Sequence, residues 1–203
     1  CWLDPPEVAG GALMALLAAS GPVTVRSVGL NPGRMGFMQV VQRMGGRLAI
    51  ENVRESCGEP LGDIIVERSE LHGTDIGAEE IPSLIDEVPI LAVLAARAAG
   101  TTMISGAAEL RVKESDRIHT VVENLRAAGV MAQERPDGMI IEGSDVALAG
   151  SAVVHGDHRI AMAFGVLSAA TGGQVRVDEP EAVAVSFPDF WSVLERMRAA
   201  SAR

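Results

Sequence analysis

The charged residues most able to do chemistry lie in the stretch LRVKESDRI, where five ionisable side chains occupy the seven positions from Arg111 to Arg117. Arg111, Lys113 and Arg117 precede or begin a predicted helix, whose positive dipole end disfavours cations by about 0.3 to 1 kcal/mol each. Glu114 and Asp116 compensate part of this charge. Three cations at a helix start also form a site for a phosphate or carboxylate. The alternative is a solvated turn with local ion pairs.

A second predicted helix begins in the stretch DHRIAMAF. Asp157 is placed to cap this helix, while His158 and Arg159 fall in its first turn, which again puts a cation at the disfavoured end. Arg159 is therefore a candidate anion ligand, and His158 is a candidate supporting residue. The alternatives are that Arg159 pairs with Asp157 or extends into solvent, and that His158 makes a structural hydrogen bond.

The stretch LIDEVPILAV places two acids before a third predicted helix. Pro89 lacks a backbone N–H and disfavours helix at Val88, so we expect the helix to start near Pro89, with Asp86 and Glu87 at its mouth. Simple capping explains either acid. Asp86, however, stands between Ile85 and a wholly apolar helix, where partial burial would make it a useful base.

The elements that must position these residues form a repeat. Three segments share one pattern, which is an Ala/Leu-rich helix, a glycine and a short Val/Thr-type strand. They cover residues 12–25, 91–104 and 164–177. Each is followed by an amphipathic helix pattern, with apolar residues three and four positions apart. These second helices are predicted at 33–46, 114–129 and 187–200.

Paired strands are predicted after the first two of these amphipathic helices. Alternating apolar residues favour the pairing of 46–52 with 63–69 and of 130–136 with 138–144. The sequence therefore predicts one α/β domain over residues 1–203. A β-α-β-β-α unit is repeated about three times in it, and the helices pack together.

The repeat predicts where the charged residues meet. When helices of successive units pack side by side, their starts can converge on one face of the domain. Asp86, the charged cluster Arg111–Arg117 and Arg159 would then lie together. A phosphate-rich ligand with a proton to move would fit that face.

The composition excludes several classes of function. The net charge is -10, which argues against nucleic acid and against an anionic membrane surface as partners. The apolar runs are shorter than the about 20 residues that cross a bilayer. Cys1 and Cys57 fit no metal-ligand spacing, so we expect no metal site and a reducing, cytoplasmic setting. The abrupt opening, CWLDPPE, suggests a fragment of a longer protein.

The three charged strings, together with NPGRMGFMQVVQRMGG and SFPDF, resemble the carboxy-terminal half of the 5-enolpyruvylshikimate-3-phosphate (EPSP) synthases over nearly the whole chain. The resemblance implies an inside-out α/β barrel domain of repeated β-α-β-α-β-β units. Its helices would pack together with their amino termini facing a cleft between two domains. It also implies that the amino-terminal domain lies outside residues 1–203.

The reaction implied by the resemblance transfers the enolpyruvyl group of phosphoenolpyruvate to the 5-hydroxyl of shikimate 3-phosphate and releases phosphate. It uses no metal and no organic cofactor. The chain would supply half of the active site. It would be active only with an amino-terminal domain or a complementing chain that supplies the other half.

The resemblance implies roles for five residues. Asp86 matches the acid that contacts the shikimate hydroxyls and takes the proton from the attacking 5-hydroxyl, and Glu114 matches the residue that moves a proton at the methylene carbon of phosphoenolpyruvate. Lys113 matches a ligand of shikimate 3-phosphate. Arg117 and Arg159 match two arginines that hold the phosphate and carboxylate of phosphoenolpyruvate. Planar guanidinium groups suit a doubly anionic substrate, and carboxylates held near cations stay ionised for proton exchange.

Two other interpretations remain open. The chain could be a non-catalytic binding module that keeps the same fold, although the intact acids and arginines count against a loss of chemistry. It could also belong to an enolpyruvyl transferase with another acceptor.

Overall fold

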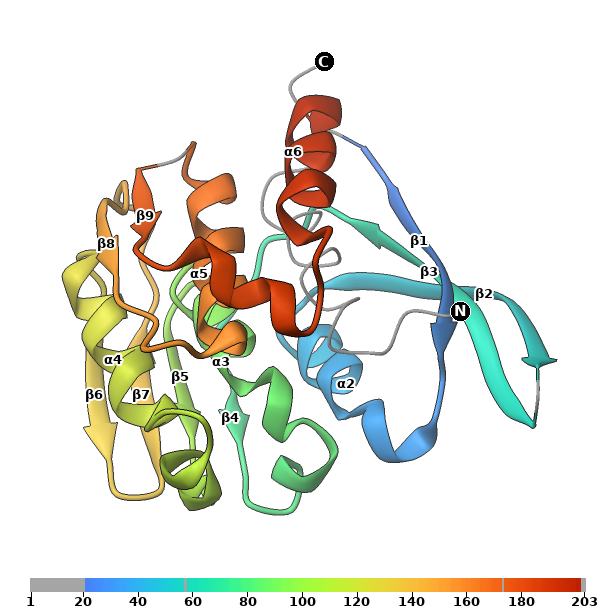
Figure 1. The fold of residues 1–203 in the computed structure, drawn as a ribbon. Coiled ribbons are helices and arrows are strands. Elements are labelled where there is room, and N and C mark those ends of the chain that lie inside the picture. Colours follow the sequence, from blue (N-terminus) through green and yellow to red (C-terminus); the bar gives the residue numbers. More distant parts are fainter. Residues whose placement is uncertain (1–20, 57, 173, 202–203) are drawn as a thin grey trace.

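The computed structural model of the chain describes residues 21–56, 58–172 and 174–201 (Figure 1). The α-helices are α2 (Gly36–Arg43), α3 (Val88–Ala95), α4 (Arg117–Ala127), α5 (His158–Ala170) and α6 (Phe190–Ser201). The strands are β1 (Val23–Gly29), β2 (Arg47–Ser56), β3 (Glu59–Glu67), β4 (Asp75–Ile76), β5 (Thr101–Ile104), β6 (Met131–Arg135), β7 (Gly138–Glu142), β8 (Gly150–Ala152) and β9 (Val175–Val177). Short 3₁₀ helices are η1 (Pro32–Arg34), η2 (Ile81–Ser83), η3 (Ile85–Glu87), η4 (Ala108–Val112) and η5 (Pro180–Val185).

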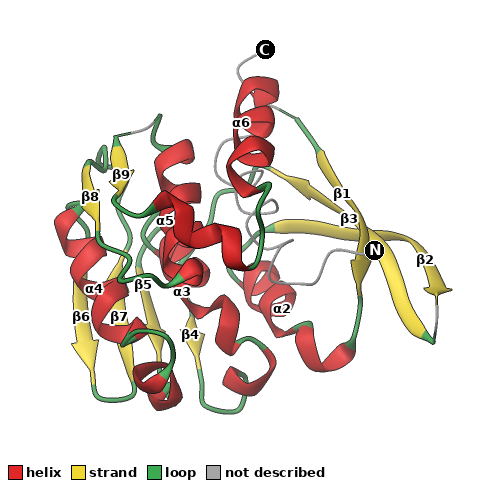
Figure 2. Cartoon of the chain, in the orientation of Figure 1, coloured by secondary structure: helices red, strands yellow, loops and turns green. Residues whose placement is uncertain are grey.

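The strands form three sheets around the helices. The first has the order β1-β3-β2 and is antiparallel, and the second has the order β4-β5-β7-β6, in which only β4 and β5 run parallel. In the third, β8 and β9 pair in parallel. Figure 2 shows the helices gathered between strands at the two sides of the molecule. Both predicted antiparallel pairs, β2 with β3 and β6 with β7, are confirmed.

The repeat predicted from the sequence is present in the structure. Its middle unit follows the order β4, α3, β5, α4, β6, β7, which is the complete β-α-β-α-β-β pattern. The first unit contributes β1, α2, β2 and β3, and the helix expected near residues 12–20 lies outside the described residues. The last unit contributes β8, α5, β9 and α6. The α/β class is therefore confirmed.

The core of the domain is built from small aliphatic side chains, and α3 lies at its centre. All the residues of α3 are buried, because α4 and α5 pack against it and η3 precedes it. A helix that is apolar on every side is stable only when it is enclosed in this way. Its sequence, VPILAVLA, has no polar residue to present to water.

Local sequence signals set the starts of the three helices that carry the charged residues. Asp116 caps α4 by accepting a hydrogen bond from the backbone N–H of His119, and Asp157 caps α5 by accepting from that of Arg159. Pro89 lies in the first turn of α3, as predicted. Val88 is nevertheless helical (φ -54, ψ -44), because its N–H bonds to the carbonyl of Ile85 in the preceding η3 turn.

Candidate active site

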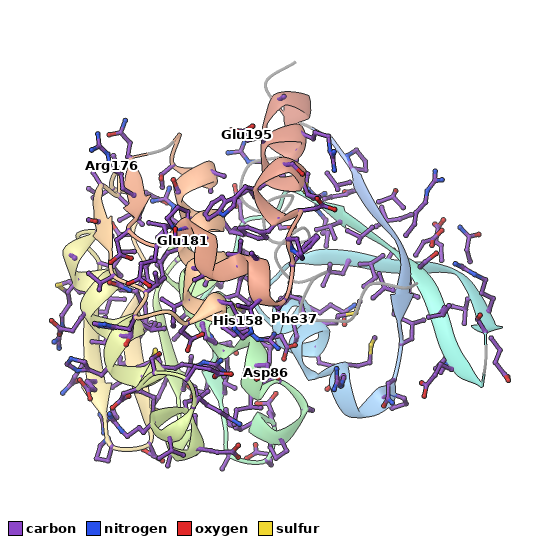
Figure 3. The ribbon with its side chains drawn as sticks, in the orientation of Figure 1. Phe37, Asp86, His158, Arg176, Glu181 and Glu195 are labelled. Carbon is purple, nitrogen blue, oxygen red and sulfur yellow. The ribbon has the colours of Figure 1, made fainter. Side chains whose placement is uncertain are left out.

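The starts of α3, α4 and α5 meet at one point, and Asp86 bridges two of them. Its Oδ1 lies 3.4 Å from Nη1 of Arg117 in α4, and its Oδ2 lies 3.4 Å from Nη2 of Arg159 in α5. Figure 3 labels Asp86 and His158, the first residue of α5, close together in the lower centre of the view. The convergence of these helix starts, predicted from the repeat, is thus observed.

Arg117 is enclosed within the site, although it is the first residue of α4. Its side chain is 2% exposed and contacts three carboxylates. The Nε edge binds Asp157, at 2.8 Å from Nε to Oδ2 and 3.3 Å from Nη2 to Oδ1. The outer edge, formed by Nη1 and Nη2, contacts Asp86 and Glu114. These acids offset the unfavourable interaction of the cation with the helix dipole.

Asp157 is the residue whose importance the sequence did not reveal, beyond its role as a cap. It is fully buried and joins α4 to α5. Its oxygens accept hydrogen bonds from Arg117 Nε, from Ser115 Oγ at 2.9 Å and from the N–H of Arg159 at 2.9 Å. Burial acts to raise the pKa of this carboxyl, but the hydrogen bonds and charge of Arg117 outweigh it and hold the pKa below its ordinary value.

Arg159 has an incomplete set of partners. Beyond the 3.4 Å contact of Nη2 with Asp86, no other residue in the described ranges bonds to its guanidinium. Its Nε is a buried donor without a hydrogen-bond partner. The side chain is 18% exposed, so part of the guanidinium can reach a ligand. This favours the anion-ligand interpretation of Arg159 over the alternative of pairing with Asp157, which binds only its backbone.

Asp86 is partly buried, as expected, but it is the more exposed of the two acids at the start of α3. The side chain of Asp86 is 43% exposed, so it lies at the open side of the site. The buried carboxyl is that of its neighbour Glu87, and burial raises the pKa of Glu87 to about 7, although the charge of Arg159 opposes this rise. The two side chains leave a 3₁₀ turn in different directions, which a sequence pattern cannot distinguish.

Two cations of the charged cluster are engaged in local ion pairs. Arg111 binds Asp116 and Glu134 and donates to carbonyl oxygens of β6 and the turn after it, so it joins the start of α4 to that strand. Lys113 pairs with Glu109, and within the described ranges no ion pair joins it to the acids and arginines at the three helix starts. For Arg111 the alternative of a local ion pair is therefore the better description.

The arrangement offers a buried arginine whose outer edge contacts only two exposed carboxylates, Asp86 and Glu114, and a second arginine with an unpaired donor. Such a set can bind a dianion and exchange protons beside it. Burial lowers the pKa of His158, and the charge of Arg159 lowers it further, so His158 is neutral at neutral pH. In the described ranges no group of three or more His, Cys, Asp or Glu side chains is placed to hold a metal ion.

The fold is that of the enolpyruvyl transferases. A solved EPSP synthase structure from Acinetobacter baumannii matches with a TM-score of 0.88 and 36% identity, covering 96% of this chain and 45% of that one. The enolpyruvyl transferase NikO from Streptomyces tendae shares the fold at 18% identity, with a TM-score of 0.67 over 95% of this chain and 42% of its own. These likenesses confirm the predicted inside-out arrangement of helices within sheets.

The family follows from the sequence comparisons. Residues 7–194 match the family model of EPSP synthase (3-phosphoshikimate 1-carboxyvinyltransferase). The 3-phosphoshikimate 1-carboxyvinyltransferase of Salinibacter ruber is 44% identical over 97% of this chain and 46% of its own length, and that of Aquifex aeolicus is 45% identical over 94% and 44%. The chain belongs to the EPSP synthase family. It spans about half the length of the curated relatives that it matches.

No helix in the part of the chain that the structure describes is long and apolar enough to cross a membrane.

Proposed function

We propose that this chain is the carboxy-terminal domain of a two-domain EPSP synthase and forms half of its active site. The whole enzyme would transfer the enolpyruvyl group of phosphoenolpyruvate to the 5-hydroxyl of shikimate 3-phosphate and release phosphate. The observation that carries the proposal is the meeting of Asp86, Glu114, Arg117 and Arg159 at three helix starts, in a chain of this family.

The contacts of Arg117 support a role in binding phosphoenolpyruvate. Because Asp157 occupies the Nε edge, a ligand can approach only the outer edge, where Asp86 and Glu114 lie. A bound anion would replace these two carboxylates on Arg117 and so release them to exchange protons. Arg159, with its unpaired donor, would hold the same anion from the start of α5.

The proton transfers then divide between the two acids. Asp86 takes the proton of the 5-hydroxyl as the hydroxyl oxygen bonds to C2 of phosphoenolpyruvate, and Glu114, in its protonated form, delivers a proton to C3. The tetrahedral adduct next loses a proton from C3 to Glu114 while the bond from C2 to the phosphate oxygen breaks. The proton held by Asp86 passes to the departing phosphate, so the products are the enolpyruvyl ether and phosphate, and both acids return to their starting forms. Lys113 would leave Glu109 to bind the 3-phosphate of the acceptor.

The amino-terminal domain would supply the rest of the cleft. One half of a two-domain site cannot exclude water or fix two anionic substrates, so we expect the isolated chain to fold but to convert no substrate. Phosphate release is measured with both substrates, first on this chain alone and then on its mixture with a matching amino-terminal domain.

The proposal predicts release of phosphate only in the mixture. Turnover by the pure chain at the rate of an ordinary enzyme would contradict the need for a second domain. If the two domains bind each other and the mixture still releases no phosphate, the proposed activity is wrong. If the mixture releases phosphate only with an acceptor other than shikimate 3-phosphate, the chain serves a related transferase.

A further inference from the structure

A buried carboxyl group beside the candidate active site has no part in the proposed transfer. Glu87 lies in η3 between Asp86 and α3, and only 6% of the residue is exposed. Within the described ranges, no ion pair or hydrogen bond joins its carboxyl group to another side chain. Its own backbone N–H is the only hydrogen-bond donor among the described residues that lowers its pKa. A buried carboxylate without a side-chain partner is unfavourable, so such a group requires a proton or a nearby cation.

Charged groups from three elements face Glu87. The cations are Arg159 of α5 and Arg34 at the end of η1, and both favour the ionised carboxyl, whereas the neighbouring Asp86 opposes ionisation. The turn that bears Arg34 lies close to η2, because α2 begins at Gly36, where a β-carbon would lie 2.0 Å from Ser83 Oγ in η2. Glu87 is therefore enclosed between the helix starts that form the site.

Arg159 supplies the second observation. Its Nε is the one buried side-chain nitrogen or oxygen, among the residues that the structure describes, without a hydrogen-bond partner. A buried donor without an acceptor is costly, and so an acceptor is expected nearby. Glu87 is a buried acceptor, and the Arg159 guanidinium is the strongest charge acting on it.

We propose that Glu87 is a positioning residue for Arg159: its carboxyl oxygen accepts a hydrogen bond from Arg159 Nε when an anion binds, which turns the Nη1–Nη2 edge toward that anion. The proposal rests on the proposed function, because the anion is the phosphate or carboxylate of phosphoenolpyruvate. Arg159 would then be held on two sides, by Glu87 at Nε and by the ligand at its outer edge.

The charge of Glu87 and its hydrogen bond have separate effects. An acceptor oxygen is present in both the protonated and the ionised acid, so the hydrogen bond does not require the negative charge. The ionised form, by contrast, repels an anion bound to Arg159. Since the pKa of Glu87 is raised to about 7, anion affinity should fall as pH rises through neutrality.

Sulfate is a suitable probe because it stays doubly charged from about pH 6 to about pH 8. It is titrated into the ¹⁵N-labelled chain while the Arg159 Nε–H signal is followed, with Arg159→Lys used to assign that signal. At about pH 6, Glu87→Leu should bind sulfate about tenfold more weakly, while Glu87→Gln, which keeps an acceptor oxygen, should stay within about threefold. Glu123→Gln, an exposed acid on α4, is the matched control and should bind normally.

The pH series is a second and independent measurement, which stands even if Glu87→Leu does not fold. Sulfate affinity of the unsubstituted chain should fall by about threefold or more between about pH 6 and about pH 8, and that of Glu87→Gln should stay level. A level profile in both proteins, or normal binding by a folded Glu87→Leu variant, overturns the positioning role. Sulfate binding by Arg159→Ala separates the two ideas: in that case, weaker binding by this variant would still support the anion site. Failure of the unsubstituted chain to bind sulfate overturns the anion site and the role of Glu87 with it.

Discussion

Asp157→Asn tests whether the buried carboxylate between α4 and α5 organises the site. The asparagine keeps an oxygen that can cap α5 and removes the charge that Arg117 binds through Nε and Nη2. Because both side chains are buried, the substitution leaves the Arg117 cation without its main partner. Breaking one partner of a buried ion pair costs about 3 to 5 kcal/mol. We expect about 3 kcal/mol, since Asp86 and Glu114 still contact the outer edge of Arg117.

Urea unfolding of the chain, followed by far-UV circular dichroism, measures this loss. With a slope of about 2 kcal/mol per molar urea, the midpoint should fall by about 1.5 M. Asp116→Asn is the matched control, because Asp116 caps α4 in a more exposed position and should cost about 1 kcal/mol or less.

The difference in stability between the unsubstituted chain and the Asp157→Asn variant should also depend on pH. The folded pKa of Asp157 is lowered, so its contribution is complete above the ordinary value of 3.8 and is lost as pH falls through the folded pKa. A loss below about 1 kcal/mol at neutral pH would refute the reasoning, because Arg117 would then be stable without the buried carboxylate.

Two further predictions concern Glu87 and Arg159. Glu87→Gln should stabilise the chain by about 3 kcal/mol at about pH 8 and have little effect below about pH 4.5. The pKa of Glu87 is raised from 4.5 to about 7 in the folded chain, so its ionisation lowers the free energy of unfolding by about 1.36 kcal/mol for each of the about 2.5 pH units between these values. Urea unfolding at the two pH values measures this, and equal effects at both would contradict it. In the two-domain protein, Arg159→Ala should raise KM for phosphoenolpyruvate more than KM for shikimate 3-phosphate, at a cost of about 1.5 to 3 kcal/mol. Steady-state kinetics decide this, and an unchanged KM for phosphoenolpyruvate would make Arg159 structural.

Periodic patterns were sufficient to predict most of the fold. The apolar spacing around Val121 and Val122 places α4, and the turn at Pro136 and Asp137 joins the predicted strands β6 and β7. These signals are local, since each depends on residues within one turn or one strand pair. Val88 shows their limit, because the restriction imposed by Pro89 was overridden by the η3 turn before it.

The site was only partly predictable, because its contacts join residues far apart in the sequence. The stretch DHRI identified Asp157 as a cap, but nothing local shows that the same carboxylate binds Arg117, 40 positions earlier. Arg111 and Arg117 likewise look alike in the sequence. Packing alone makes one a surface ion-pair partner and buries the other. The available signal was the excess of three cations over two acids at the start of α4, and this signal does not distinguish Arg117 from Arg111.

The roles of Asp86 and Glu87 required the three-dimensional arrangement for the same reason. Both acids precede an apolar helix, and the sequence favoured Asp86 as the partly buried one. The 3₁₀ turn of η3 directs Glu87 inward, toward Arg159, and leaves Asp86 at the open side, where it contacts two arginines. A difference of one position around a turn therefore decides which carboxyl is buried.

The central claim is that this cluster moves protons in enolpyruvyl transfer, and the turnover number of Glu114→Gln in the two-domain protein tests it most directly. The amide keeps the shape of the side chain and removes the carboxyl group that we propose moves the proton at C3 of phosphoenolpyruvate. General acid–base groups contribute about 10²- to 10⁴-fold, so kcat should fall by that range while the urea midpoint stays nearly constant. The matched control Glu123→Gln, on the exposed side of α4, should keep its kcat. A Glu114→Gln enzyme with normal kcat, or one whose loss of activity follows only from unfolding, would contradict the account.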